Sequence, residues 1–157
     1  MYAYQLKALV EKDRVLRGIF LGVFSKNTLP PLVHGQEAAF IANTQHSSRV
    51  GRHWVSVYYN GREVYFIDPL GRPPQYYGKE FVQCLKGFRK VQKLKWAVQD
   101  EKKSNLCGFF NILFLYFLIR DYPLSYILLE ILRQHPHEND AIVQRFICEK
   151  FGYKRFS

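Results

Sequence analysis

The sequence predicts an α+β domain in which a small sheet, mixed or antiparallel, packs against one buried central helix. β-Branched and aromatic residues dominate 54–59 and 63–67, and Asn60-Gly61 between them supplies the positive φ angles of a tight hairpin turn. The run from Leu106 to Ile119 is apolar all round, as in a buried helix. Helical patterns lie before and after these segments, which is the order of an α+β domain.

Each further element has its own local signal. Leu6, Leu9 and Val10 have the spacing of a short amphipathic helix over residues 4–12. The other expected elements are, in order, a strand over 19–24, a strand or helix over 37–44, a loop over 70–74, a helix over 79–90, a third strand over 93–99, the central helix over 107–120, and helices over 124–134 and 140–151. Pro123 ends the central helix.

Length and composition predict a single domain over 1–157, with 48% hydrophobic residues to fill its core. The three cysteines form neither an even disulfide framework nor a metal-ligand spacing, so we expect reduced thiols in an intracellular, reducing compartment and no metal. The start resembles no signal peptide, and the longest apolar run is too short to span a bilayer. We therefore expect a soluble monomer that needs no membrane.

The net charge of +10 is concentrated in one segment. Residues 79–103 hold eight Lys or Arg against three acidic residues, an excess that is half of the total. A polyanion such as DNA would bind such a stripe without sequence preference, although the charge could equally be a solvated helix face. The candidate DNA-binding residues are Lys86, Arg89, Lys90, Lys93 and Lys95.

The residues around the hairpin and the central helix suggest nucleophilic catalysis. Cys107 opens the central helix, whose N-terminus favours a thiolate over a thiol. His53 directly precedes one hairpin strand and Asp68 directly follows its partner, so antiparallel pairing brings both to the same end of the sheet. Cys107 is then the candidate nucleophile, His53 its base, and Asp68 the acid that orients the imidazole.

An oxyanion that forms during acyl transfer also needs hydrogen-bond donors. The Gln99 side-chain amide and the backbone N–H of Cys107 are the candidates. Each residue also has an ordinary structural explanation: a free cysteine is usually a small buried hydrophobe, as we expect for Cys84 and Cys148, and Asp-Pro often opens a turn. The order His, Asp, Gln, Cys, together with the hairpin, favours the catalytic interpretation.

This pattern resembles the adenain-type cysteine peptidases, the family of the adenovirus endopeptidase, and their relatives that process SUMO. The shared features are His53-Trp54 at a strand start, an acid at a strand end, then Gln99, and Cys107-Gly108 opening a buried helix. The resemblance covers roughly residues 4–120, and it also includes Gln5-Leu6-Lys7-Ala8-Leu9-Val10, Phe20-Leu21-Gly22, Ala42-Asn43-Thr44 and Pro69-Leu70-Gly71.

The resemblance implies an adenain-like fold and assigns Cys107, His53, Asp68 and Gln99 the family's catalytic roles. It places Trp54 and Gly108 beside the active site, with the Trp54 ring packed over it. It also implies a cysteine endopeptidase that cleaves viral precursor and capsid proteins after small, Gly-containing motifs, in the virion and the infected cell. The chemistry needs no cofactor, and stimulation by DNA or a short peptide stays open, although no cysteine matches the one that links adenain to its activating peptide.

Two alternatives remain. A SUMO or ubiquitin-like-modifier isopeptidase would share the fold and the catalytic residues, but a chain of 157 residues leaves little room for a modifier-docking surface. A non-catalytic DNA- or capsid-binding protein would not need the intact set of His53, Asp68 and Cys107. The source, whether a DNA virus or a virus-like transposon of the Polinton/Maverick type, would separate viral from cellular roles.

Overall fold

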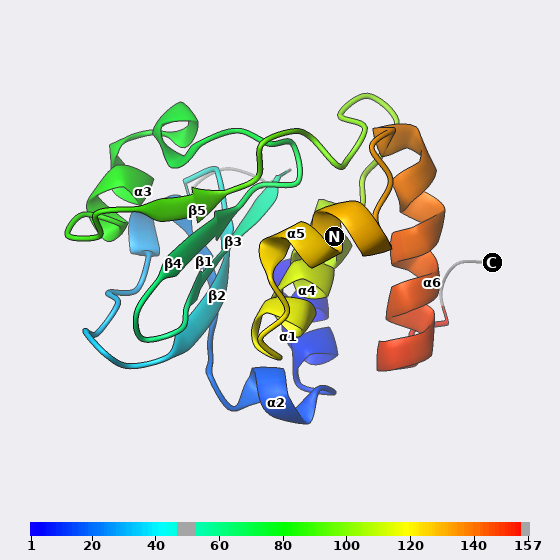
Figure 1. Ribbon diagram of the computed structural model, residues 1–157. Coiled ribbons are helices and arrows are strands. Elements are labelled where there is room, and N and C mark those ends of the chain that lie inside the picture. Colours follow the sequence, from blue (N-terminus) through cyan, green and yellow to red (C-terminus); the bar gives the residue numbers. More distant parts are fainter. Residues whose placement is uncertain (47–52, 155–157) are drawn as a thin grey trace.

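A computed structural model describes residues 1–46 and 53–154, and within them the strands form one five-stranded mixed sheet (Figure 1). The strands follow the chain order β1 (Phe20–Ser25), β2 (Ala38–Asn43), β3 (Trp54–Tyr59), β4 (Val64–Ile67) and β5 (Val91–Lys93). The central three are antiparallel, while β1 and β5 pair in parallel with β2 and β4. The predicted α+β class is confirmed, and 37–44 contains a strand rather than a helix.

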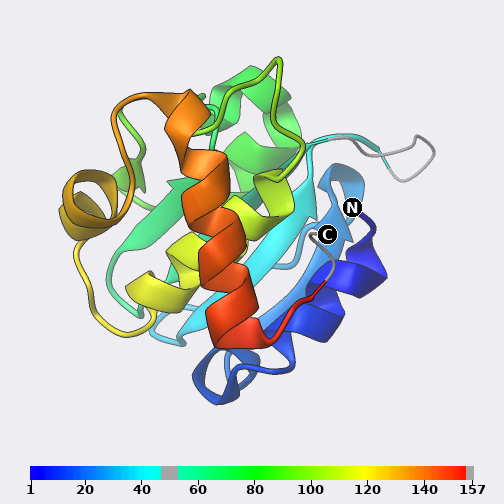
Figure 2. The same cartoon turned by 90° about the vertical axis from the view of Figure 1, so that its right-hand side faces the viewer.

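Helices cover both faces of this sheet. They are α1 (Ala3–Val10), α2 (Arg14–Arg17), α3 (Lys79–Cys84), α4 (Cys107–Leu118), α5 (Leu124–Tyr126) and α6 (Asn139–Phe151), with 3-10 turns η1 (Lys26–Thr28), η2 (Pro74–Tyr77) and η4 (Pro136–Glu138) and the π-helical turn η3 (Ile127–Ile131). Helix α3 lies on one face and α4 on the other (Figure 1). Helix α6 covers α4 on the side away from the sheet (Figure 2).

Strand β3 is buried along its whole length because both of its faces are covered. Side chains alternate along a strand, so Trp54, Ser56 and Tyr58 face α4 while Val55, Val57 and Tyr59 face α3. The first face joins the large core around α4, and the second joins a smaller core that includes Phe81 and Leu85. This explains why the hairpin strands lack the polar alternation of a half-exposed sheet.

Helix α4 is the central buried helix that the sequence predicts. It begins at Cys107, and ten of its 12 residues are buried. In the part of the chain that the structure describes, no helix is long and apolar enough to cross a membrane.

Three predicted elements differ from the structure. The strand expected over 93–99 is wrong: β5 ends at Lys93, and the N–H groups of Val98 and Gln99 both donate to the Pro69 carbonyl instead of a strand ladder. The helix expected over 79–90 ends at Cys84, shortly before Gly87, whose φ of +100° a helix cannot accommodate. The helix expected over 124–134 is the short α5 followed by η3, which ends at Ile131.

Candidate active site

The β3–β4 hairpin brings His53 and Asp68 together. Its register pairs Ser56 with Ile67, so the residue before β3 and the residue after β4 lie at the same end of the sheet. His53 Nε2 lies 2.6 Å from Asp68 Oδ1. This is the contact that the Asn60-Gly61 turn and the strand lengths predict.

The Asp68 carboxylate is held by the loop that it opens. It is 1% exposed, and its Oδ1 accepts from the Leu70 N–H at 2.9 Å as well as from His53. Its Oδ2 accepts from the Arg72 N–H at 3.3 Å and from the Tyr77 hydroxyl. Because all four groups donate, they fix the carboxylate and satisfy its buried oxygens. Asp68 therefore gives the imidazole a rigid partner.

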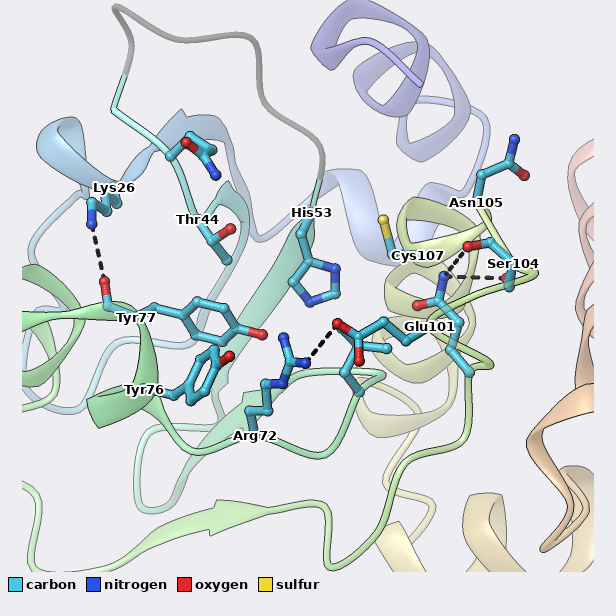
Figure 3. A pocket seen from close by; sticks show the side chains of 13 residues that line it. Lys26, Thr44, His53, Arg72, Tyr76, Tyr77, Glu101, Ser104, Asn105 and Cys107 are labelled. Carbon is cyan, nitrogen blue, oxygen red and sulfur yellow. Dashed lines mark hydrogen bonds and ion pairs between the residues drawn. The ribbon is translucent and has the colours of Figure 1, made fainter.

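Cys107 lies beside the His53 ring (Figure 3). It is the first residue of α4 and is 4% exposed. Burial alone would lower the pKa of His53, but hydrogen bonds to Asp68 and to Cys107 outweigh it and raise the pKa to about 9. Since Nε2 binds Asp68, Nδ1 is the ring nitrogen left for Cys107. A protonated imidazole in this position favours the thiolate of Cys107.

His53 and Cys107 line a cavity of about 520 Å³ (Figure 3). Its wall comes from segments that are distant in the sequence: η1, the residues after β2, the loop after β4, η2 and the loop before α4. Arg72 and Glu101 join two of these segments through an ion pair of 2.7 Å. The lining residues are Lys26, Thr44, Gln45, His53, Leu70, Arg72, Tyr76, Tyr77, Gln99, Glu101, Ser104, Asn105 and Cys107.

Gln99 also lines this cavity, and a close backbone approach places it there. Gly71 has a φ of +75°, and a Cβ at this position would lie 2.7 Å from the Trp96 carbonyl carbon. Only glycine therefore lets the loop after Asp68 pack against the segment that leads to Gln99. The Gln99 Nε2 donates to Ser104 Oγ at 3.2 Å and to the Ser104 carbonyl at 3.3 Å, while its buried Oε1 has no partner among the described residues. Its NH₂ is thus engaged by Ser104, and its oxyanion role stays a prediction.

Trp54 and Gly108 are not among the described residues that line this cavity, and both pack against the core. The Trp54 ring is 6% exposed, packs in the core around α4, and donates from Nε1 to the Met1 carbonyl at 3.2 Å. A Cβ on Gly108 would lie 2.6 Å from Leu6 Cδ2. The two residues therefore connect α1 to the start of β3 and α4.

Tyr77 is a site residue that the sequence reasoning missed. Its hydroxyl donates to Asp68, and its ring centroid lies 5.7 Å from that of His53. Burial and the charge of Asp68 raise the pKa of Tyr77, so it remains a protonated donor. A tyrosine in a loop nine residues after the acid carries no periodic signal; only the 3-10 turn η2 brings it back to Asp68.

The candidate DNA-binding residues do not form a helix face, because all of them follow the end of α3 and lie in the connection to β5, at the end of β5 and beyond it. All five are exposed. Lys86, Arg89 and Lys93 line a second cavity of about 340 Å³, together with apolar residues such as Leu85 and Val91. Lys90 and Lys95 are not among the described residues that line it.

None of the three cysteines is in a disulfide, and their surroundings differ. Cys84 and Cys148 are half-buried, rather than buried as predicted. Burial raises the pKa of Cys84 to about 11, which makes it a poor nucleophile at neutral pH. Within residues 1–46 and 53–154, no group of three or more His, Cys, Asp or Glu side chains could hold a metal ion.

The buried Asp68 carboxylate thus contacts the His53 imidazole, and this imidazole contacts the Cys107 thiol at the start of α4, beside the cavity. This arrangement is able to activate the thiol for attack on an acyl carbon. Comparison with models of known protein families finds no match, and comparison with curated proteins finds no significant one.

Proposed function

We propose that the protein is a cysteine endopeptidase with an adenain-like fold. The observation that carries this proposal is the position of His53, hydrogen-bonded on one side to the buried Asp68 and on the other to Cys107. An orienting acid, a base and a thiol in this sequence of contacts form the unit that activates a cysteine nucleophile. The proposal needs no cofactor for the chemistry.

In the first half of the reaction, the Cys107 thiolate attacks the carbonyl carbon of the scissile peptide bond. A C–S bond forms, and the C=O electron pair moves to oxygen to give a tetrahedral oxyanion. Collapse of this intermediate breaks the C–N bond, and the His53 imidazolium gives its proton to the leaving amine. Asp68 stays ionised and keeps the ring oriented.

In the second half, His53 takes a proton from water, and the resulting hydroxide attacks the thioester. Collapse breaks the C–S bond and releases the Cys107 thiolate and the carboxylic acid product, which loses its proton to solvent. The backbone N–H of Cys107 and the Gln99 NH₂ are the candidate donors to both oxyanions. Gln99 would reach this role by a side-chain rotation that takes Nε2 away from the Ser104 hydroxyl and carbonyl oxygens.

For substrates, the family resemblance favours viral capsid and precursor proteins cleaved next to small residues, chiefly glycine. A SUMO or ubiquitin-like-modifier isopeptidase would use the same three residues, and a cleavage profile separates the two activities. Non-specific DNA binding is a second candidate property, favoured by the grouping of Lys86, Arg89 and Lys93 around one cavity. DNA could then raise proteolysis by holding the enzyme and a DNA-bound substrate together.

Cleavage of a proteome-derived peptide library, read by mass spectrometry, tests this function. The wild-type protein should cut peptides at defined sites, and Cys107→Ala should abolish cutting while the far-ultraviolet circular dichroism spectrum is unchanged. Cys84→Ala and Cys148→Ala are the matched controls and should retain most activity. Loss of activity in either control but not in Cys107→Ala would refute the assignment of the nucleophile.

A further inference from the structure

A buried amide lies directly behind the candidate nucleophile. Asn111 is on α4, one turn after Cys107, and its side chain has no exposed surface. Its Nδ2 donates to two backbone carbonyls, that of Cys107 at 2.8 Å and that of Trp54 at 2.8 Å. Its Oδ1 accepts from the Ser56 hydroxyl at 2.7 Å, and Ser56 is also fully buried.

The Trp54 carbonyl needs this donor because of where β4 ends. The His53 carbonyl accepts from the Thr44 N–H on the β2 side. Carbonyls alternate along a strand, so the Trp54 carbonyl points to the β4 side. There the ladder stops at the Ser56–Ile67 pair, since Asp68 turns into its loop. A buried carbonyl at this position would otherwise lose a hydrogen bond.

We propose that Asn111 is a positioning residue that sets the separation of His53 from Cys107. The inference rests on the proposed function. One planar amide joins the carbonyl of the residue after the base to the carbonyl of the nucleophile itself, and thereby links β3 to the first turn of α4. Since Asp68 already fixes the imidazole relative to the hairpin, this link fixes the thiol relative to the imidazole.

A purely structural role for Asn111 predicts that Asn111 and Ser56 variants change the site to the same extent. Ser56 and Asn111 belong to the same buried polar network, and removing either side chain should lower the stability of the core. Only Asn111, however, joins the backbones on which the base and the nucleophile sit. Ser56→Ala leaves both bonds from Nδ2 in place, which makes it the matched control.

The test compares wild type, Asn111→Leu and Ser56→Ala by two measurements. The first is the titration of His53 followed by nuclear magnetic resonance, and the second is the pH dependence of Cys107 alkylation by iodoacetamide. In Asn111→Leu the His53 resonance should titrate at lower pH, and alkylation near neutral pH should slow at least about tenfold, because a separated thiol behaves as an ordinary one. Ser56→Ala should match wild type in both measurements.

Asn111→Ser guards against a Leu variant that does not fold. Its hydroxyl can still bond the Cys107 carbonyl four residues earlier, as helical serines do, but is too short to reach Trp54. We expect it to shift both measurements in the same direction as Asn111→Leu. Wild-type values in a folded Asn111 variant, equal shifts in Ser56→Ala, or failure of both Asn111 variants to fold would overturn the inference. A wild-type protein whose His53 titrates near 9 but which cleaves no peptide would refute the proposed function alone.

Discussion

Replacement of Asp68 by asparagine isolates the charge of the orienting acid, because the two side chains have nearly the same shape. The asparagine oxygen should stay at the position of Oδ1, because the Leu70 N–H there can only donate, and His53 Nε2 can then keep donating to the same oxygen. Its NH₂ then faces Tyr77, whose hydroxyl can turn and accept. The weaker contact from the Arg72 N–H is lost. We therefore expect a variant that folds but lacks the negative charge beside His53.

The rise in the pKa of His53 gives the size of the effect. A rise from 6.5 to about 9 corresponds to about 3 kcal/mol in favour of the imidazolium. Asp68 and Cys107 together produce this rise against the opposing effect of burial. Without the carboxylate charge, burial gains relative weight, and the pKa of His53 should fall below about 7. A fall of about two pKa units lowers the equilibrium constant for proton transfer from Cys107 to His53 about 100-fold, and kcat/KM should drop by a similar factor.

Two measurements check this prediction: the titration of His53 by nuclear magnetic resonance, assigned by comparison with His53→Gln, and kcat/KM against pH. The matched control is Glu63→Gln, which makes the same chemical change in an exposed carboxylate that bonds only Gln92 among the described contacts. The control should leave both values unchanged. A pKa of His53 near 9 in Asp68→Asn, with kcat/KM within twofold of wild type, would refute the role of Asp68.

Three further predictions concern stability and binding. The pKa of His53 in the folded protein lies above 6.5, so the stabilisation of the fold by the protonated imidazole is complete below pH 6.5 and is lost as the pH rises through about 9. The melting temperature should therefore fall over that range, and it should fall less in His53→Gln. Gly108→Ala should cost about 1–3 kcal/mol in urea unfolding because its Cβ meets Leu6, whereas Gly18→Ala, with 3.4 Å to its nearest neighbour, should be tolerated; equal stability would contradict the close packing. Random duplex DNA should bind at low salt and dissociate at moderate salt, and equal affinity after changing five cations to Gln would show that they are only a solvated surface. Those cations are Lys86, Arg89, Lys90, Lys93 and Lys95.

The sequence predicts the hairpin and the position of two catalytic candidates because both depend on local chemistry. Asn60-Gly61 sets the turn, and the turn with its strand lengths decides where His53 and Asp68 lie. The start of the buried helix at Cys107 follows in the same way from an apolar run. Signals within about fifteen residues of one another suffice for these features.

The predictions fail where tertiary contacts decide the backbone. The segment over 93–99 has strand composition, yet after Lys93 the N–H groups of Val98 and Gln99 bond the Pro69 carbonyl, which no local pattern reveals. Tyr77 escaped notice because a loop tyrosine carries no periodic signal, and only the 3-10 turn η2 returns it to Asp68, nine residues earlier. Asn111 escaped notice because its partner Trp54 lies 57 residues earlier in the chain. Ser104, which engages Gln99 five residues earlier, lies in a loop and carries no periodic signal either.

The catalytic candidates and the walls of their cavity are held in different ways. His53, Asp68 and Cys107 stand at the ends of β3, β4 and α4, and buried side chains tie those ends together. Most of the wall comes instead from loops and short 3-10 turns, joined by an Arg72–Glu101 pair that is partly exposed and contributes little stability. In the proposed peptidase, walls built from loops would let substrate preference change without moving the thiol. Substitutions in the walls should therefore change which peptides are cut, whereas substitutions behind Cys107 should change how fast any peptide is cut.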